Sequence, residues 1–522
     1  MKGVKLKRVQ SIDETIHALY SKLSKPFKTA FTAAMVFGLI AHLYMFMNKL
    51  PNYDDMGLNG FGATFRLGRW FLWVLGAVAY HLNFVYSLPW VNGLITLIFI
   101  ALSAGLVADL FQIKSMAGNV VLGAAMAVYP SWTATFFFMF TAPYYAIALC
   151  LAVCAVYMTV KGKRFFLPAS VILACSLGIY QAYLPFAAAI YVIVIILTIL
   201  KPEYDFQKVI KQSFYYLEQL VMGGIIYFII TELSLEVTNQ QLADYKGVDA
   251  IGSFSGFRLV EFEKMIVRDF FGLAYNNNFE LSYNYVTKWM YLFLFVLLGA
   301  LIIVSFKILV SKRQYLKAVE LAVMAFCFVI AVNSIYIVCG DVYSLMRFSY
   351  VNLLILPLCL IDRYKRIEMS QRATNRIRLT EWVTILVLTA GILSYCHYAN
   401  AQYLSLHLGF EQASAYYGTV ITQIKELEGY DPEMETAFIG YGNIEDQSLY
   451  RNQVMEVFDM SGRDAVMAQA YSIEYFLKYY CGFDTKLVEM DANRKEIKQM
   501  PVYPAEGAIK IVDDIVVVKF AN

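Results

Sequence analysis

Two adjacent carboxylates, Asp54 and Asp55, follow the first long apolar segment of a 522-residue chain. One carboxylate could accept a proton from a hydroxyl group, while the other, whose ionisation the first disfavours, orients a substrate or binds a divalent cation. Such pairs also occur in solvated turns and helix caps. Their place beside an apolar segment favours a catalytic role at a membrane surface, because charge is costly there and is usually functional.

Four arginines supply a second kind of chemistry. Arg66 and Arg69 follow the acidic pair closely, Arg268 lies between two later apolar segments, and Arg347 stands at the boundary of another. A guanidinium group binds phosphate through a rigid fork of N–H donors. Arginines at a membrane boundary also extend towards lipid headgroups without any further role. We interpret the four as candidates for a clamp that holds a phosphate or pyrophosphate group.

The elements that must position these residues lie in a membrane. The chain is 59% hydrophobic and 16% charged, with a mean hydropathy of +0.54, whereas soluble domains contain about 25% charged residues. The eight cysteines are scattered, without the spacing of metal ligands. The net charge of +3 is small and carries no information about nucleic acid, and we expect no nucleic acid partner. Composition therefore predicts a polytopic α-helical membrane protein in contact with lipid.

Apolar runs predict about eleven transmembrane helices, since roughly 20 residues cross a bilayer. The predicted spans are 29–48, 90–112, 117–132, 139–160, 166–181, 183–200, 214–234, 287–308, 318–338, 346–362 and 380–398. More than half of the 43 Lys and Arg residues lie before the first span or in the loops on the same side of the membrane as the N-terminus. The positive-inside rule then places the N-terminus in the cytoplasm and the C-terminus outside.

Two segments are predicted to lie along the membrane surface. The first is residues 1–28, a cytoplasmic segment whose amphipathic helix, at 11–28, begins with a capping box of Ser11 and Glu14. The second is residues 61–82, as one or two interfacial helices. Residues 70–90 could instead cross the membrane, but the later basic loops would then lie outside, against the positive-inside rule.

Outside the membrane, the prediction leaves two loops, 49–89 and 235–286, within a transmembrane domain at 29–398, and a tail at 399–522. We expect the chemistry on this side because the cytoplasmic loops are short. The tail is predicted to be a small external α/β domain. Its expected elements are a helical stretch at 402–428, a strand at 436–441, a helix at 465–480, and strands at 486–490 and 515–520.

Two predicted spans end in polar or proline-containing turns, at 129–132 and 178–181. Lipid cannot satisfy the backbone of such turns, so we expect protein or a cavity open to the outer face around them. Candidates for substrate binding are polar and aromatic side chains that lie near these turns, near the acidic pair or near the boundary of a later span. They are Tyr53, Trp70, Tyr129, Tyr180, Gln181 and Asp341.

The order of several short motifs resembles that of a known family. The motifs are Asn52-Tyr53-Asp54-Asp55, Leu67-Gly68-Arg69-Trp70, Tyr129-Pro130, Ile179-Tyr180-Gln181 and Met500-Pro501-Val502-Tyr503-Pro504. This order is similar to that of the bacterial serotype-converting glucosyltransferases, the type II glucosyltransferases, of the GT-C class of membrane glycosyltransferases. The resemblance covers nearly the whole chain, although each motif alone is unspecific.

The resemblance implies transfer of a hexose, typically glucose, from undecaprenyl phosphate to a cell-surface glycan on the external face of the cytoplasmic membrane. It places the catalytic acid in the first external loop. In GT-C enzymes the first acid of such a pair is usually the base, so the resemblance implies Asp54 rather than Asp55. The donor carries its own activation, so no cofactor is required. A divalent metal, with Asp54 and Asp55 as its ligands, stays open because GT-C enzymes differ in this respect.

Other functions compete with this hypothesis. A flippase or transporter of lipid-linked sugars would also combine many spans with buried polar groups, but such proteins often contain internal repeats, and we find no convincing repeat. A polymerase or ligase of the same glycans would use similar substrates. An interaction protein that acts through residues 399–522 is a further alternative.

Overall fold

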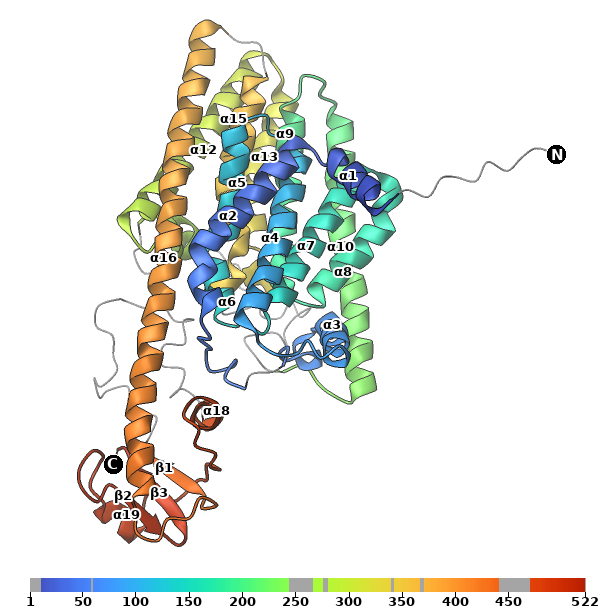
Figure 1. Ribbon diagram of the computed structural model, residues 1–522. Coiled ribbons are helices and arrows are strands. Elements are labelled where there is room, and N and C mark those ends of the chain that lie inside the picture. Colours follow the sequence, from blue (N-terminus) through green and yellow to red (C-terminus); the bar gives the residue numbers. More distant parts are fainter. Residues whose placement is uncertain are drawn as a thin grey trace, which may run out of the picture.

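A long helix links a bundle of apolar helices to a small sheet domain at one end of the protein (Figure 1). The computed structural model describes seven parts of the chain: 11–57, 60–243, 266–275, 280–338, 342–366, 370–440 and 470–521. The candidate Asp341 and half of the second predicted external loop, at 244–265 and 276–279, lie outside the described residues.

The N-terminal amphipathic helix, α1 (Ile12–Lys22), has the predicted capping box, in which Ser11 and Glu14 each cap the other's backbone N–H. Its apolar side chains are exposed, as Ile12 and Ile16 show. The prediction that this helix continues to residue 28 is wrong. It ends at Lys22, because Ser24 caps the next helix, α2 (Lys25–Met47), which has a proline in its first turn.

Eight helical segments among the described residues are long and apolar enough to cross a membrane, which confirms a polytopic membrane protein. Several expose large apolar side chains over their length, as expected for helices that face lipid. The eight are α2, α4 (Pro89–Phe111), α7 (Ala142–Lys161), Gln181–Ile199 with α9 (Leu184–Ile199), α10 (Phe206–Thr238), α12 (Tyr285–Ser311), α13 (Tyr315–Asn333) and α16 (Gln371–Lys425).

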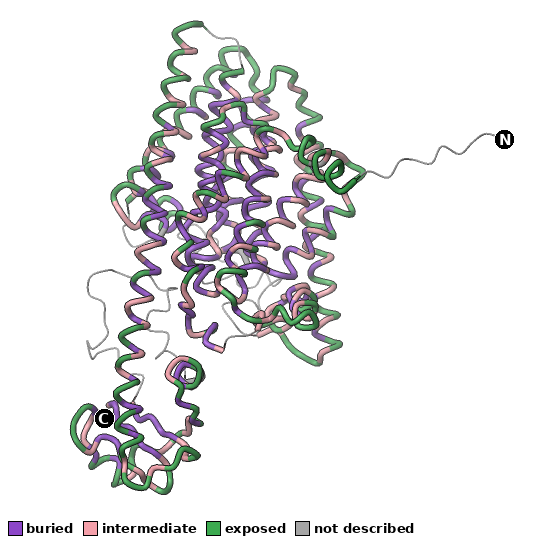
Figure 2. The backbone as a smooth tube through the Cα atoms, viewed as in Figure 1, coloured by how far each residue is buried: buried purple, intermediate pink, exposed green. Residues whose placement is uncertain are grey.

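The other three predicted spans are helices too short to cross a bilayer alone. They are α5 (Met116–Val128), which bends into α6 (Pro130–Phe136), then α8 (Phe166–Leu177) and α15 (Asn352–Lys365). Helices α5, α6 and α15 are buried along most of their length, so protein rather than lipid surrounds them (Figure 2). A helix enclosed by protein need not match the bilayer thickness, which is why hydropathy alone overestimates the number of full-length spans.

Shorter helical turns join these elements. They are η1 (Phe65–Leu67), η2 (Lys163–Phe165), η3 (Gln181–Tyr183), η5 (Ile266–Phe270), η6 (Phe271–Ala274), η7 (Glu280–Ser282), α14 (Ile335–Val338), η8 (Ser344–Met346) and η9 (Phe348–Val351). Most of them lie between the end of one long helix and the start of the next.

Small residues allow α2, α4 and α5 to pack closely. A methyl group at Gly123 of α5 would lie 2.2 Å from the carbonyl oxygen of Ala30 in α2, so the two backbones are in contact. The ring of Phe46 in α2 similarly occupies the space that a side chain at Gly93 of α4 would need. Close approach at small residues is the usual way in which helices associate inside a membrane.

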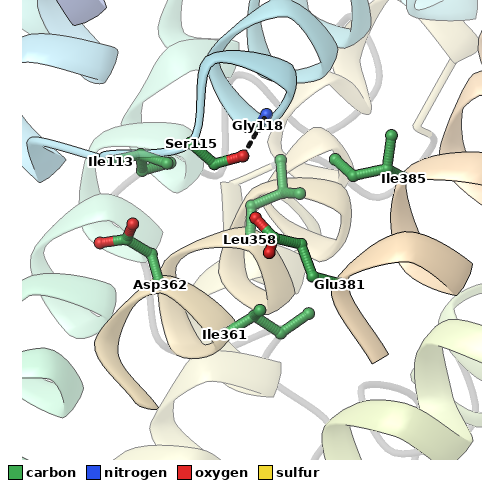
Figure 3. A pocket seen from close by; sticks show the side chains of 8 residues that line it. All are labelled: Ile113, Ser115, Gly118, Leu358, Ile361, Asp362, Glu381 and Ile385. Carbon is green, nitrogen blue, oxygen red and sulfur yellow. Dashed lines mark hydrogen bonds between the residues drawn. The ribbon is translucent and has the colours of Figure 1, made fainter. Parts of the chain in front are cut away.

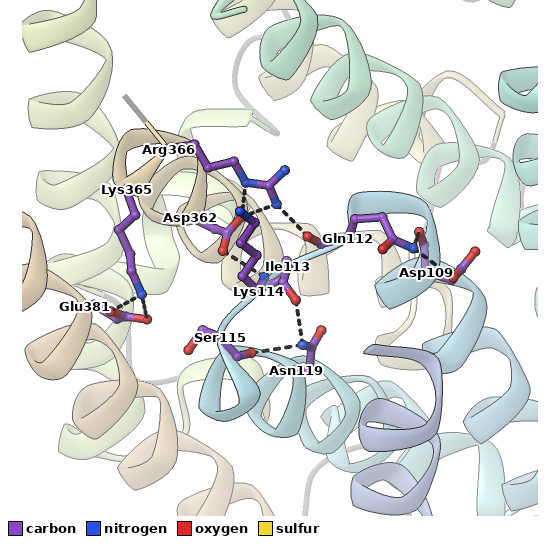
Figure 4. A network of polar contacts seen from close by, with 10 residues as sticks. All are labelled: Asp109, Gln112, Ile113, Lys114, Ser115, Asn119, Asp362, Lys365, Arg366 and Glu381. Carbon is purple, nitrogen blue, oxygen red and sulfur yellow. Dashed lines mark hydrogen bonds and ion pairs between the residues drawn. The ribbon is translucent and has the colours of Figure 1, made fainter. Parts of the chain in front are cut away.

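One end of the bundle, which we call the basic end, is joined by polar contacts between loops that were predicted to be cytoplasmic. Arg366 donates to the Gln112 carbonyl at 2.5 Å and pairs with Asp362, while Lys365 pairs with Glu381 at 2.7 Å (Figure 4). A small pocket between Ser115, Asp362 and Glu381 lies at the same end (Figure 3). The candidate functional residues are not among those that line it.

The opposite end, which we call the site end, contains α3 (Trp70–His81) and α6 (Figure 1). Helix α3 has 12 residues, fewer than a span requires, and it exposes Trp73, Val78 and Tyr80. This geometry favours the predicted interfacial position over the alternative of a further span.

Helix α16 runs without interruption for 55 residues and extends from the bundle to the sheet domain (Figure 1). The helical stretch predicted at 402–428 is therefore the end of α16, and the predicted domain boundary at 399 falls inside a helix rather than in a linker. Apolar residues such as Tyr417 and Ile424 continue along α16 and enter the core of the sheet domain.

Within its described residues, 426–440 and 470–521, the sheet domain contains three strands in the order β1-β3-β2, with β1 parallel and β2 antiparallel to β3. Its elements are β1 (Thr436–Ile439), α18 (Ala470–Tyr480), α19 (Lys495–Gln499), β2 (Ile509–Val512) and β3 (Ile515–Lys519). The predicted strand at 486–490 is wrong: the segment makes a single bridge, between Leu487 and Thr436. Helix α19 and strand β2 were not predicted.

The close contact at Gly123 leads to a stability prediction. Gly123→Ala should lower the free energy of unfolding by about 1–3 kcal/mol, since the added methyl group would press on the α2 backbone. Thermal unfolding of the detergent-solubilised protein measures the effect. Gly224→Ala is the matched control, because nothing lies within 4 Å of its added methyl group. Equal stability of the two variants would contradict this description of the interface.

Candidate active site

The two neighbouring carboxylates occupy different environments. Asp54 is exposed, and its backbone N–H donates to Asn52 Oδ1 at 2.9 Å, which makes a local turn. Asp55 is only 3% exposed. Its Oδ2 atom lies 3.1 Å from Lys49 Nζ and accepts a hydrogen bond from Ser87 Oγ at 2.9 Å. The backbone turn thus directs one acid outwards and the other inwards.

Burial governs the electrostatics of this ion pair. It raises the pKa of Asp55, an effect opposed by the charge of Lys49 and the hydrogen bond from Ser87. Burial likewise lowers the pKa of Lys49, and Asp55 opposes that shift. Lys49 follows α2 and Ser87 precedes α4, so the pair joins two helices. Asp55 therefore has a structural position, and Asp54 is the acid that a substrate can reach.

The pair does not present two open carboxylates to a metal ion. A cation between Asp54 and Asp55 would have to displace Lys49 from Asp55. Across the described ranges, no group of three or more His, Cys, Asp and Glu residues is placed to hold a metal.

The sheet domain covers residues 52–57, the segment around Asp54 and Asp55 that we call the acidic loop. Met56 is fully buried in the core of that domain, beside Tyr417 of α16 and Phe476 of α18. Ser472 of α18 donates a hydrogen bond to the Tyr53 carbonyl at 3.1 Å. The pKa of Tyr480 in α18 is raised by burial and then by the charge of Asp55. Residues more than 400 positions apart in the sequence thus form one unit.

Arg69 lies against two tyrosine rings and has spare hydrogen-bonding capacity. Its Nη1 donates to the Tyr145 hydroxyl at 3.0 Å, and its guanidinium carbon lies 5.7 Å and 5.3 Å from the ring centroids of Tyr145 and Tyr180. These two rings stack at 4.1 Å. Arg69 Nε is buried, and within the described part of the chain it has no hydrogen-bond partner. A buried donor without an acceptor in the protein is able to bind a water molecule or a polar ligand.

The two sequence motifs around Arg69 and Tyr180 dock on each other. The Gly178 carbonyl accepts hydrogen bonds from the backbone N–H groups of Phe71 and Leu72, at 2.8 and 3.0 Å, which satisfies the first turn of α3. Gln181 Nε2 donates to the Leu67 carbonyl at 2.8 Å. Trp70 is buried against Gly178. Trp70 and Gln181 therefore position Arg69, and protein surrounds the predicted turn at 178–181.

Arg268 and Arg347 meet at a common acid that sequence reasoning missed, Asp269. Arg268 Nε lies 2.6 Å from Asp269 Oδ1, and Arg347 Nη2 lies 3.5 Å from Oδ2, to which Tyr336 also donates. Burial opposes ionisation of Asp269, but the hydrogen bonds from Arg268 and Tyr336 and the charge of Arg347 outweigh it and lower the pKa of the carboxyl. Two guanidinium groups and one carboxylate leave one positive charge in excess.

Aromatic contacts connect the two arginine sites. The ring centroids of Tyr180, beside Arg69, and Tyr183 are 5.6 Å apart. Those of Tyr183 and Phe348, which follows Arg347 directly, are 6.0 Å apart. Ser131 of α6 donates to the Ser344 carbonyl at 2.7 Å, which brings the segment before Arg347 to the site end. The fold therefore places both arginine sites at the end of the bundle that also holds the acidic loop.

Other predicted residues have local roles. Arg66 is exposed, and its carbonyl accepts from the Ala243 backbone N–H at 2.8 Å. Tyr129 is completely buried, with its hydroxyl 2.9 Å from that of Tyr291, which in turn lies 2.8 Å from that of Tyr395. Protein therefore surrounds the turn at 129–132 as well, and this tyrosine chain belongs to the interior of the bundle.

Three residues of the site were not predicted. Tyr145 is one of 39 tyrosines, so the sequence contains no signal that distinguishes it. Lys49 stands six residues before Asp55, and a basic residue so close to an acid at the end of a span could have suggested an ion pair. Asp269 directly follows Arg268 and could have been recognised as an acid that competes with phosphate for that arginine.

Comparison with known proteins identifies the family. A model of the family described as Glucosyl transferase GtrII matches residues 43–355. No curated protein and no solved structure matches the chain. The matched segment contains the acidic loop, Arg69 and the cluster around Asp269, and it ends before α16 and the sheet domain. Since the match covers more than half of the chain, this protein belongs to the GtrII family of glucosyltransferases.

Proposed function

We propose that the protein transfers glucose from a polyprenyl-phosphate donor to a cell-surface glycan, on the external face of the cytoplasmic membrane. The observation that carries this proposal is the buried Arg69 Nε, a donor without a described acceptor at the same end of the bundle as the exposed Asp54. Both residues border the connection between α6 and α7: the Tyr53 ring contacts Phe138, and Arg69 contacts Tyr145.

The donor phosphate would bind Arg69, where a phosphate oxygen supplies the acceptor that Nε lacks. The cluster of Arg268, Asp269 and Arg347 has an excess positive charge, which would attract the same headgroup. The rings of Tyr180, Tyr183 and Phe348 lie between this cluster and Arg69. The prenyl tail would lie against exposed apolar side chains, such as Phe228 and Leu233 of α10. A lipid-linked donor can use such a surface directly, because its tail needs no aqueous path.

The reaction would be a single displacement at the anomeric carbon. The acceptor hydroxyl oxygen forms a bond to the anomeric carbon, its proton passes to Asp54, and the bond between that carbon and the phosphate oxygen breaks. Polyprenyl phosphate leaves with the electron pair, and the configuration inverts. The phosphate is charged before and after the step, so catalysis rests mainly on positioning and on the base.

The proposed orientation follows from the two ends of the bundle. The basic end gathers Lys114, Lys365 and Arg366, which the positive-inside rule assigns to the cytoplasm. The site end and the sheet domain would then face outwards, where a surface glycan is available. Because the donor is already activated, the proposal requires no nucleotide at that face.

Asp54→Asn should lower kcat by roughly 10²–10⁴-fold, because the amide cannot accept the proton of the incoming hydroxyl. Release of polyprenyl phosphate from synthetic polyprenyl phosphoglucose, in the presence of acceptor glycan, measures the loss. Glu506→Gln, at an exposed acid in the sheet domain, is the control and should retain activity. Full transfer by Asp54→Asn would exclude this base. Wild-type protein that moves labelled lipid across vesicles without transfer would favour a flippase.

Asp55 should behave differently from Asp54. Asp55→Asn and Lys49→Met should each lower thermal stability, since each leaves a buried partner unpaired. The double variant should recover part of the loss, with a coupling free energy of about 0.5–3 kcal/mol. Unfolding curves of the four proteins measure it. Strictly additive losses would show that the ion pair does not hold the acidic loop.

Arg69→Ala should raise the donor KM at least tenfold, as both a charge and a fork of donors are lost. Arg69→Lys should give an intermediate KM, because it restores the charge alone. Initial rates at varied polyprenyl phosphoglucose measure these constants. Arg372→Ala, at an exposed arginine of the basic end, provides the control. An unchanged donor KM in Arg69→Ala would place the phosphate elsewhere.

A further inference from the structure

Two tyrosines on α18 form an exposed aromatic surface. The side chains of Tyr475 and Tyr479 are one helical turn apart, with ring centroids separated by 6.0 Å and planes inclined by only 14°. They are 41% and 46% exposed. The opposite face of α18 is fully buried in the sheet domain through Ile473, Phe476 and Leu477. The packing of the domain therefore does not require the two exposed rings.

The aromatic surface begins where the acidic loop ends. A methyl group at Gly57, two residues after Asp55, would lie 3.5 Å from the ring of Tyr475, so the loop passes beside this ring. The hydrogen bond from Ser472 to the Tyr53 carbonyl fixes the same helix to the start of the loop. Asp54 stands between these two attachments. The two attachments therefore place α18 beside the loop that carries Asp54.

Charged groups flank the rings. Lys478 lies between the two tyrosines in sequence, and its Nζ pairs with Asp484 Oδ2 at 2.8 Å, with both side chains accessible to solvent. Asp484 and, more weakly, the neighbouring Glu474 raise the pKa of Lys478. Flat apolar rings beside solvated donors and acceptors match a pyranose, which has C–H groups on its faces and hydroxyls around its edge. The same charges disfavour insertion of the surface into lipid.

The position of α18 in the chain indicates which substrate it serves. The segment that matches the family ends at residue 355, and α18 lies beyond it, in the sheet domain. The acidic loop, Arg69 and the cluster around Asp269 all lie inside the matched segment. The residues that the proposed function assigns to the donor thus come from the matched segment, which leaves the acceptor as the sugar that α18 would meet. Tyrosine suits this role because it gives a large contact area with little loss of rotamer entropy.

We propose that Tyr475 and Tyr479 form a binding subsite for the acceptor glycan, on which successive sugar rings stack while a hydroxyl further along the chain reaches Asp54. This subsite rests on the proposed glucosyl transfer and assigns its acceptor side to the sheet domain. The contacts of Gly57 and Tyr53 with α18 keep the subsite and the base in a constant relation.

Kinetics of the full-length protein in lipid nanodiscs test the subsite. Tyr475→Ala with Tyr479→Ala should raise the KM for acceptor glycan at least tenfold, and leave the donor KM unchanged. Tyr475→Phe with Tyr479→Phe should stay near wild type, because stacking uses the ring. Tyr20→Ala, at an exposed tyrosine of α1, is the control. An acceptor KM unchanged in the double alanine variant would overturn the inference, as would a rise in donor KM alone.

Direct binding separates this inference from the proposed reaction. The probe is surface polysaccharide from cells that lack this protein, and saturation-transfer NMR measures its contact with the wild-type and double alanine proteins, with circular dichroism as a check of folding. Loss of contact in the folded double variant supports the subsite, even if the wild type transfers no glucose and the proposed reaction fails. Equal contact with both proteins rejects the subsite, even if transfer is observed.

Discussion

The ion pair between Lys49 and Asp55 is the interaction on which the site depends. It lies where α2 ends and α4 begins, and Ser87 completes it. A buried carboxylate needs such partners, since desolvation disfavours its charge. With Asp55 held inwards, the turn at Asn52 leaves Asp54 exposed, and Met56 reaches the core of the sheet domain. One buried contact thus sets the direction of the catalytic candidate and the attachment of the tail.

The arginine sites differ in how far an acid of the protein already pairs with their positive charge. Arg268 and Arg347 share Asp269, so part of their charge is already neutralised within the protein. Arg69 is held by a hydroxyl and two ring faces, which orient the guanidinium without neutralising it. Such a residue is oriented before a phosphate arrives and retains its full charge for it. This difference makes Arg69 the principal phosphate candidate.

The sheet domain is part of the site through the geometry of α16. A helix of 55 residues is long enough to cross the bundle and continue well beyond it at about 1.5 Å per residue. Because no break interrupts α16, the domain that it carries is held next to the acidic loop. The hydrogen bond from Ser472 of α18 to the Tyr53 carbonyl joins the two. The arrangement places a solvent-exposed domain directly beside the end of the bundle that contains Asp54 and Arg69.

Local sequence signals determined the membrane class, the capping box at Ser11, the places of most helices, the strands at 436 and 515, and the residue types able to act as base and phosphate ligand. Each depends on neighbours within a few positions, through apolar length, caps and charge. Tertiary structure alone decided that Lys49 occupies Asp55, that Tyr145 holds Arg69, that Arg347 shares Asp269 and that α18 covers the acidic loop. These contacts join distant residues, and only the packing of helices around buried charge and small side chains brings them together.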